Sequence, residues 1–231
     1  MIDAILDFFF PPKCPFCMEI LSSKAPVCDN CISTLPFNDE KCCDICSRPI
    51  EDFSYSTCLN CREQKIYFEH SFVPLIYKDE AKEAVLRLKK GHPSFSKGFA
   101  YLLADKILSS PNYKNFDVIT FVPQSYKGRL NRGYNQAELI ARDLSKLLNI
   151  PCITFLIKTD DGEEQHLLTA TQRRENVKKC YFSKNIKGKG RVLLVDDIYT
   201  TGSTTNHCSR LLRKMGFSEV YLAVAMIRTD D

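Results

Sequence analysis

The chain has 231 residues, of which 44% are hydrophobic, and it carries a formal net charge of +4 at pH 7. This length suits one α/β domain with a smaller domain beside it, and the hydrophobic content excludes an intrinsically disordered chain. No apolar stretch reaches the roughly 18 to 20 residues that cross a bilayer. The sequence therefore predicts a cytoplasmic protein without a transmembrane segment.

Cysteines are concentrated in the first part of the chain. Nine of the twelve lie between residues 14 and 61, and eight of these form four C-x2-C pairs. In a reducing compartment such pairs are typical of Zn(II) sites, whereas a disulfide framework belongs to exported proteins. Two sites of four sulfurs leave no coordination position for a substrate, so two structural zinc ions are expected. The predicted ligands are Cys14, Cys17, Cys28, Cys31, Cys43, Cys46, Cys58 and Cys61.

The four pairs can share two zinc ions in more than one way. Ten, eleven and eleven residues separate successive pairs, so a consecutive and an interleaved arrangement are both compatible with the sequence. We favour the consecutive arrangement because it closes short loops and loses little chain entropy. Cys42, next to Cys43, is either a spare thiol or a sign of ambiguous register. We expect residues 1–66 to form the zinc-binding domain and residues 67–231 to form the larger domain.

Charge is divided unevenly between these two parts. Residues 1–70 contain eleven acidic residues and six Lys or Arg, whereas residues 71–231 contain seventeen acidic residues and twenty-six Lys or Arg. A polyanion such as nucleic acid is therefore expected to prefer the larger domain. Its basic residues cluster at 82–97, 127–132 and 173–191, although a solvated surface without a partner explains the first cluster equally well.

The larger domain shows alternating strand and helix patterns. Short apolar runs predict buried strands, and apolar residues at helical spacing predict amphipathic helices between them. Asn135 is a candidate N-cap, and Gly216 ends the helix before the final strand. This alternation predicts an α/β fold with a doubly wound, mainly parallel sheet. The expected strands are 71–77, 117–122, 153–158, 191–196 and 219–227, and the expected helices are 79–90, 95–109, 136–149 and 203–215.

The run from Val192 to Thr204 combines three features of a ligand site. Four apolar residues predict a strand, Asp196 and Asp197 follow at its carboxyl end, and a hydroxyl-rich turn leads into a helix. Open α/β sheets bind ligands at the carboxyl ends of their strands, and N–H groups at a helix N-terminus bind anions. A plain strand-to-helix turn is the alternative, but it requires neither two adjacent carboxylates nor four hydroxyls. The turn contains Thr200, Thr201, Gly202, Ser203 and Thr204.

This pattern resembles the 5-phosphoribosyl 1-diphosphate (PRPP) signature of type I phosphoribosyltransferases. The resemblance implies the type I phosphoribosyltransferase fold, with the acids holding the ribose 2- and 3-hydroxyls and the turn holding the 5-phosphate. In a transferase, Asp196 and Asp197 would be the catalytic residues and PRPP would bind together with Mg(II). Lys127 and Arg129 would face the diphosphate leaving group, with ordinary solvated loop charge as the alternative.

Further segments extend the resemblance to nearly the whole chain. Together with the paired C-x2-C motifs, three segments resemble the ComF family of competence proteins: VPQS at 122–125, RGYNQAELIAR at 132–142 and TQRRENVKKCYF at 171–182. The resemblance implies a role in handling incoming single-stranded DNA during natural transformation. It also implies contacts with competence proteins such as the ComFA helicase, in the cytoplasm or at the periphery of the DNA-uptake machinery.

Three functions remain open on the sequence. The first is a phosphoribosyltransferase with an unknown acceptor that acts in DNA uptake, and the second is a non-catalytic PRPP sensor that acts through nucleic acid and protein contacts. The third, a nucleotide-salvage enzyme, is disfavoured because residues 71–115 contain no recognisable reader of a base. For a transferase, the polar loop at 159–175 with Arg173 and Arg174 is the candidate for closing over the diphosphate.

Overall fold

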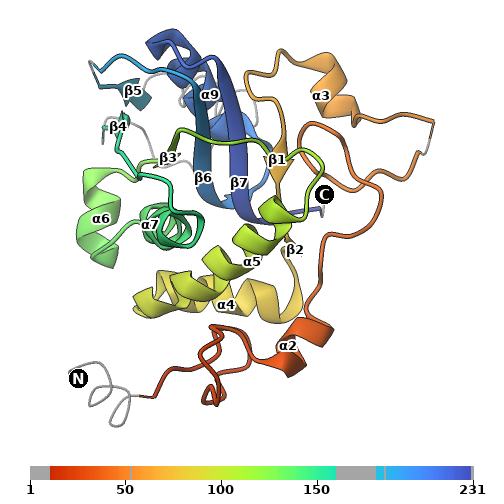
Figure 1. Ribbon diagram of the computed structural model, residues 1–231, viewed down its shortest axis with the longest axis vertical. Coiled ribbons are helices and arrows are strands. Elements are labelled where there is room, and N and C mark those ends of the chain that lie inside the picture. Colours follow the sequence, from red (N-terminus) through yellow and green to blue (C-terminus); the bar gives the residue numbers. More distant parts are fainter. Residues whose placement is uncertain (1–10, 53, 160–180, 185, 230–231) are drawn as a thin grey trace.

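A five-stranded parallel sheet forms the centre of the computed structural model, which describes residues 11–52, 54–159, 181–184 and 186–229. The strand order is β1-β7-β6-β3, and β2 continues beside β7 where β1 ends (Figure 1). Every strand pair in this sheet is parallel. Parallel neighbours need crossover connections, here containing helices, that return the chain to the end of the sheet at which the previous strand began. The strands are β1 (Ser71–Phe72), β2 (Leu75–Ile76), β3 (Val118–Phe121), β6 (Arg191–Tyr199) and β7 (Glu219–Ile227).

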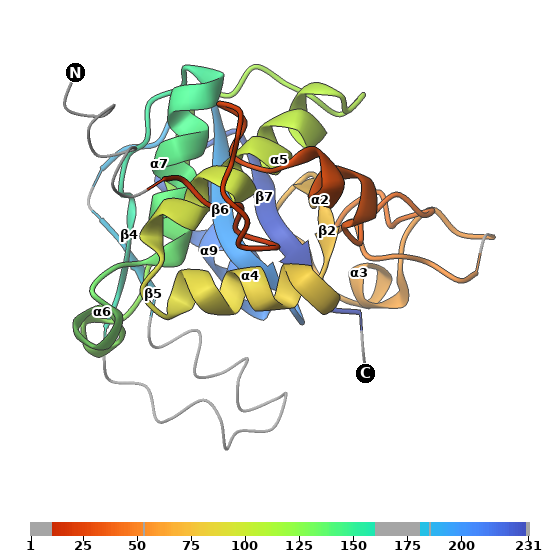
Figure 2. The same ribbon diagram turned by 90° about the horizontal axis from the view of Figure 1, so that it is seen from below.

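Helices cover both faces of this sheet (Figure 2). Leu193 and Val195 of β6 share one apolar cluster with α4, α5 and α7, whereas Val192 and Leu194 share the other cluster with α9. Successive strand residues are thus buried on opposite faces, which explains the continuous apolar run and confirms the doubly wound architecture. The helices are α4 (Asp79–Lys89), α5 (Ser96–Leu108), α7 (Gln136–Leu148) and α9 (Ser203–Met215), with the 3-10 turn η1 (Pro93–Phe95) before α5.

Two predicted helix boundaries are confirmed by their capping contacts. The Asn135 side chain accepts a hydrogen bond from the N–H of Ala137 at 3.1 Å and donates one to the carbonyl of Val122 at 2.9 Å. It therefore starts α7 and ties that start to the end of β3. At the other boundary, Gly216 ends α9 in the left-handed conformation, with φ of 110°.

The strand expected at 71–77 is interrupted. β1 and β2 keep one common register against β7, in which Phe72 pairs with Ala223 and Leu75 pairs with Met226. Pro74 lies between them and has no N–H to donate to the ladder. Its carbonyl instead accepts a hydrogen bond from the N–H of Asn38 at 2.8 Å. The break therefore gives the N-terminal part of the chain a backbone contact with the sheet.

The strand expected at 153–158 is wrong as a member of the main sheet. Cys152 forms an isolated parallel bridge with Ile119 of β3, and the chain then leaves that sheet. β4 (Leu156–Lys158) pairs antiparallel with β5 (Tyr181–Ser183) in a separate two-stranded sheet. The polarity of this pair depends on a distant partner, which the local apolar pattern does not identify.

The connection after β3 contains a helix that the sequence pattern does not predict. α6 (Tyr126–Arg132) begins at Ser125, whose hydroxyl accepts a hydrogen bond from the N–H of Gly128 at 3.1 Å. None of its residues is buried, so it has no apolar stripe that would reveal it. β6 is also longer than expected, because it continues through the acid pair to Tyr199.

The cysteine-rich segments pack against the larger body in two separate places (Figure 1). The first cysteine unit (residues 14–31) runs into α2 (Asp29–Thr34) and lies against α4 and α5, where the Phe16 and Phe99 rings meet edge to face. The second cysteine unit (residues 43–61) ends in α3 (Leu59–Glu63) and belongs to the apolar cluster that contains Tyr199. Within the described residues, no helix has both the length and the apolar composition needed to cross a membrane.

Candidate functional site

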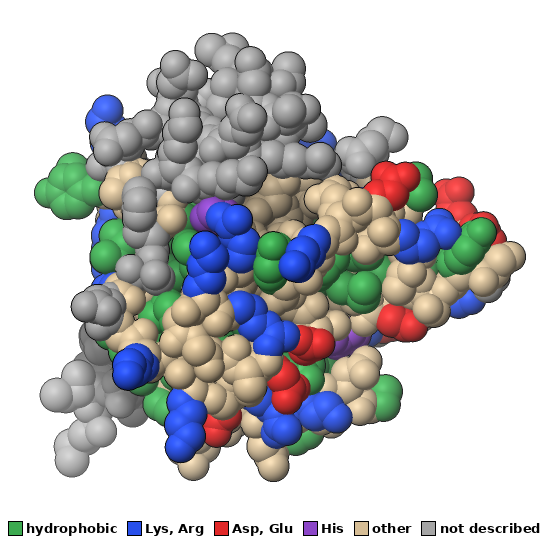
Figure 3. All heavy atoms as spheres, turned by 90° about the horizontal axis from the view of Figure 1, so that it is seen from above, with side chains coloured by type: hydrophobic (Ala, Val, Ile, Leu, Met, Phe, Trp, Pro, Cys, Tyr) green, Lys and Arg blue, Asp and Glu red, His purple; other side chains and the backbone are tan. Residues whose placement is uncertain are grey.

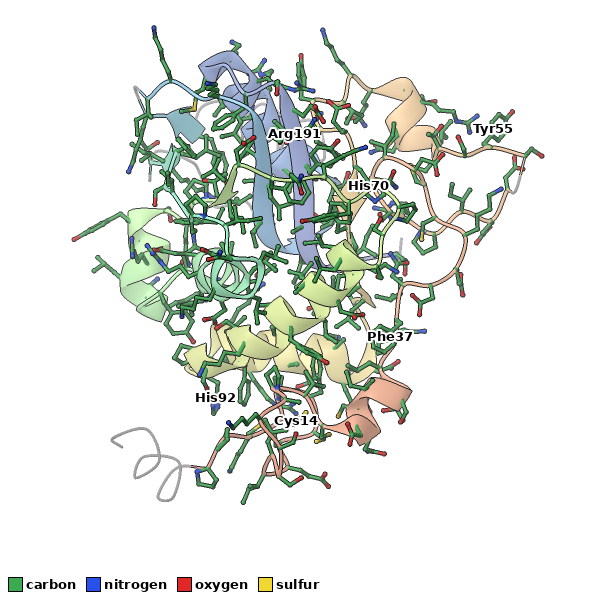
Figure 4. The ribbon with its side chains drawn as sticks, in the orientation of Figure 1. Cys14, Phe37, Tyr55, His70, His92 and Arg191 are labelled. Carbon is green, nitrogen blue, oxygen red and sulfur yellow. The ribbon has the colours of Figure 1, made fainter. Side chains whose placement is uncertain are left out.

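Eight cysteine thiols form two compact clusters. Cys14, Cys17, Cys28 and Cys31 make the first, and Cys43, Cys46, Cys58 and Cys61 make the second; within each, the sulfur atoms lie within 4.8 Å of one another. Tetrahedral Zn–S bonds of about 2.3 Å place sulfurs roughly 3.8 Å apart, so both sets fit Zn(II). In Figure 4, Cys14 lies beside α4, away from the second unit, which includes the loop that bears Tyr55.

The grouping confirms the consecutive arrangement of the pairs. Cys42 is not a member of the second cluster, since its thiol donates a hydrogen bond to the Asn38 side chain at 3.3 Å. None of the described cysteines forms a disulfide. The eight clustered thiols are therefore available as metal ligands, and Cys42 is the spare thiol of the two alternatives.

Within each cluster the environment lowers the pKa of some thiols, whereas burial and neighbouring thiols raise the pKa of Cys17, Cys31, Cys46 and Cys61. Burial opposes ionisation of Cys14, but backbone N–H donors, including that of Cys28, outweigh it and lower its pKa to about 7. In the second cluster, a hydrogen bond from the Cys46 thiol is the largest of the effects that lower the pKa of Cys58 to about 6. Because thiolates are the form that binds Zn(II), metal binding would require the remaining thiols of each cluster to release their protons.

The acid pair lies in the last part of β6, just beyond the point where β3 ends, and Asp196 is paired with Val224 of β7. The Oδ1 of Asp196 accepts a hydrogen bond from the N–H of Asp197 at 2.9 Å, and the Oδ1 of Asp197 accepts one from the N–H of Ile198 at 2.8 Å. These contacts fix the orientation of both carboxyl groups. Burial, followed by the neighbouring Asp197 carboxylate, raises the pKa of Asp196 well above its usual value.

A cation from another element balances one of these acids. The Nζ of Lys89, in the last turn of α4, lies 2.7 Å from Oδ2 of Asp197 in a partly buried ion pair. The sequence shows Lys89 only as part of the basic cluster at 82–97 and gives no sign of its contact with the acid pair. The contact depends on how α4 packs against the sheet, and no local motif signals it.

The turn after β6 has the form of an anion site. Gly202 adopts the left-handed conformation with φ of 75° and precedes α9 directly, so the N-terminus of α9 opens onto the turn. The hydroxyls of Thr201 and Ser203 are 3.0 Å apart and lie at the surface side of the turn. A Cβ at position 202 would overlap the Tyr199 hydroxyl, so glycine is required for space as well as for conformation.

The two predicted diphosphate cations lie on α6, which follows the neighbouring strand β3. Arg129 pairs with Glu138 of α7 at 3.4 Å, rather than with the acid pair. Lys127 is exposed on the same helix. The structure thus brings both residues to the end of the sheet that carries the acids. The predicted closing loop, with Arg173 and Arg174, lies outside the described residues from position 160 onward.

Two family models match the chain. A double zinc ribbon domain matches residues 5–62, which contain all eight clustered cysteines. A phosphoribosyl transferase domain matches residues 132–231, which contain the acid pair and the turn before α9. Together with the parallel sheet, these matches show a type I phosphoribosyltransferase fold preceded by a cysteine-rich zinc-binding region.

Whole-chain relatives identify the family. Competence protein F of Haemophilus influenzae is 30% identical over 229 residues, covering 92% of this chain and 95% of the relative. This chain belongs to the ComF family. Competence protein ComFC of Bacillus subtilis is 26% identical over 219 residues, covering 91% of this chain and 87% of that protein. The DNA utilization protein YhgH of Escherichia coli K12 is 26% identical over 217 residues, covering 91% of this ComF-family chain and 94% of that protein.

Proposed function

We propose that this ComF-family chain binds PRPP at the carboxyl end of β6. The observation that carries the proposal is the direct succession of an acid pair, a left-handed Gly202 and the N-terminus of α9 in one stretch of chain. N–H groups at that terminus would bind the 5-phosphate, and Asp196 and Asp197 would accept hydrogen bonds from the ribose hydroxyls. Donors from the ligand favour ionised carboxylates and would relieve the repulsion between these two acids.

Mg(II) is part of the proposed ligand. Lys89 balances the charge of Asp197 but leaves a second acid beside it, whose pKa is raised. Carboxylate oxygens are the ligands that Mg(II) prefers, and Mg(II) is commonly carried into a site by phosphate groups. When bound, the cation would supply positive charge near the diphosphate. Lys127 and Arg129 on α6 would approach the same group from the end of β3.

The biological role that we propose is the handling of single-stranded DNA during natural competence. Two relatives are named competence proteins and a third is named a DNA utilization protein. On this chain, α6 presents Lys127 and Arg132 together with Tyr126 and Leu130, whose side chains are 67% and 65% exposed. Cationic and aromatic side chains on one exposed helix suit contact with phosphates and unstacked bases.

The distribution of charge agrees with this role. On the face that Figure 3 shows, Lys and Arg side chains spread over the larger body with some acidic side chains among them, and further acidic side chains lie on the protruding end. That end is the second cysteine unit (Figure 1). A polyanion is therefore expected on the larger body rather than on the zinc-binding region.

Calorimetric titration with PRPP tests the ligand site. We expect binding that is weak without Mg(II) and that weakens by about 1 to 3 kcal/mol in Asp197→Asn, the range of a lost hydrogen bond to a charged group. The paired change Thr201→Ala with Gly202→Ala should have a similar effect, because it alters the phosphate turn. Asp105→Asn, an exposed change on α5, is the matched control. Unchanged affinity in folded variants of both kinds would refute the PRPP site.

A further inference from the structure

The second cysteine unit is fastened to the turn that precedes α9. The guanidinium of Arg48 donates one hydrogen bond to the carbonyl of Thr200 at 2.6 Å and another to the carbonyl of Arg228 at 3.0 Å. These carbonyls lie just beyond the carboxyl ends of β6 and β7. Arg48 thus bridges the ends of the two central strands at the point where the turn begins.

The geometry of the cysteine cluster sets the position of Arg48. It lies two residues after Cys46, and its carbonyl accepts a hydrogen bond from the N–H of Cys43 at 2.8 Å. Between them, Ser47 adopts a left-handed conformation with φ of 57°, and its N–H donates to the carbonyl of Cys43 at 2.9 Å. The backbone of Arg48 is therefore part of the knuckle that carries two of the four metal ligands.

The segment that follows the second unit contacts the start of α9, on the other side of the turn. The Asn206 side chain, in the first turns of α9, accepts a hydrogen bond from the N–H of Tyr67 and donates one to the carbonyl of Lys65, both at 2.9 Å. Residues 65–67 follow α3 directly. Beneath the turn, Tyr199 is 2% exposed and shares an apolar cluster with the four cysteines of the second unit.

The first cysteine unit makes contacts of a different kind. Arg87 of α4 donates hydrogen bonds to the carbonyls of Pro15 and Phe16 at 3.3 and 2.9 Å, and Gly98 of α5 packs closely against Pro15. These contacts support α4 and α5. Within the described residues, no hydrogen bond or ion pair joins the first unit to the turn after β6, so the two units provide a natural comparison.

We propose that Arg48 is a positioning residue that couples the second cysteine unit to the conformation of residues 200–204. In this arrangement, zinc at Cys43, Cys46, Cys58 and Cys61 keeps the knuckle folded, and the knuckle holds the turn through Arg48. The inference rests on the proposed function only for the identity of the ligand, which is the 5-phosphate of PRPP. An arginine suits the bridge because its planar group donates to two carbonyls at once, whereas a lysine presents one compact ammonium.

Hydrogen exchange in the zinc-loaded, ligand-free protein tests the coupling. We expect Arg48→Ala to speed exchange in the peptide from Tyr199 to His207 by about tenfold while both zinc ions remain bound. Arg48→Lys should restore only part of the protection. Arg62→Ala is the matched control, because Arg62 lies on α3 directly after Cys61, and its guanidinium is 3.8 Å from the centre of the Tyr55 ring instead of at the turn.

Zinc loss from one unit at a time gives a second test. Cys46→Ser is expected to loosen the same peptide as Arg48→Ala does, whereas Cys17→Ser should leave its exchange rate unchanged. Unchanged exchange in Arg48→Ala would overturn the coupling, as would equal loosening by Cys17→Ser and Cys46→Ser.

Affinity for PRPP separates this inference from the proposed function. If the wild-type protein binds PRPP, Arg48→Ala should weaken binding by about tenfold, and full affinity with a loosened turn would overturn the positioning role. If the wild-type protein does not bind PRPP, the proposed function fails, and the exchange measurements still decide whether Arg48 holds the turn.

Discussion

Lys89 and Asp197 form a partly buried ion pair, with 2.7 Å between Nζ and Oδ2, that joins the end of α4 to the end of β6. The pair places a positive charge at the proposed binding site for PRPP, which is negatively charged. We expect Lys89→Gln to weaken PRPP binding by about tenfold, which corresponds to about 1.4 kcal/mol. Calorimetry with Mg(II) present measures the change.

The neighbouring lysine supplies the control for this prediction. Lys90→Gln removes the same charge from an exposed position just after α4, so its affinity should stay within about twofold of wild type. An equal loss in both variants would mean that general charge, rather than the pair with Asp197, supports binding. No loss in Lys89→Gln would remove this lysine from the site.

Asp196 should make the ligand-free protein less stable at neutral pH. Burial and the Asp197 carboxylate raise the pKa of Asp196, so the folded protein binds this proton more tightly than the unfolded chain does. The contribution of the group to stability is therefore greatest below the ordinary aspartate pKa of about 4 and decreases as the pH rises through the raised pKa. Asp196→Asn should increase the free energy of unfolding at pH 7, with a gain that shrinks toward pH 4.

Urea unfolding across this pH range measures the effect. Asn retains the side-chain oxygen that accepts from the N–H of Asp197 at 2.9 Å, so the local geometry is preserved. A variant less stable than wild type at pH 7, or a gain independent of pH, would contradict the prediction. The same variant should bind PRPP poorly, because the Asp196 carboxylate is proposed to bind the ribose. The residue would then favour ligand binding at the expense of stability.

Metal content provides an independent prediction. The purified protein should contain two zinc ions, and Cys14→Ser or Cys58→Ser should each remove about one, because each cluster draws its four ligands from one unit. Elemental analysis of the reduced protein measures the ratio. Loss of both ions from either single change would contradict independent sites, and a ratio near zero in wild type would refute the zinc assignment.

The features that the sequence predicted well are local in the chain. The strand, acid pair and turn from Val192 to Thr204 are contiguous, so their order already places the carboxylates beside the helix N-terminus. The pairing of cysteines also follows from short separations, which favour closing nearby loops. Asn135 as a helix cap is likewise a property of one residue and its neighbours.

The features that the sequence did not predict depend on distant partners. Lys89 meets Asp197, and Arg48 meets Thr200, only after the sheet and the cysteine units have packed together. β4 pairs with β5, a strand that comes well after β4 in the sequence, and not with the main sheet. α6 is not predicted for a different reason. None of its residues is buried, so its sequence lacks the periodic apolar residues that indicate a helix.

Binding of single-stranded DNA should show the salt dependence of a few phosphate contacts on the larger body. About three to five contacts predict a slope of about -2 to -4 for log affinity against log salt concentration. Lys89 is engaged with Asp197, so the exposed Lys90 and Lys97 represent the first basic cluster. Replacing both with alanine should flatten the slope by about 1.

Charge-matched changes on the first cysteine unit and on α6 decide where the DNA binds. Lys127→Ala with Arg132→Ala should also flatten the slope. Tyr126→Ala should reduce the affinity but leave the slope unchanged, because stacking on a base releases no counterions. Lys13→Ala with Lys24→Ala removes two exposed charges near the first cluster and should leave the slope unchanged.

Full-length protein is required, because both cysteine clusters belong to the apolar clusters of the larger body. Fluorescence anisotropy across a salt series measures each slope. If only the Lys13 and Lys24 changes flattened it, the zinc-binding region would carry the DNA contact instead.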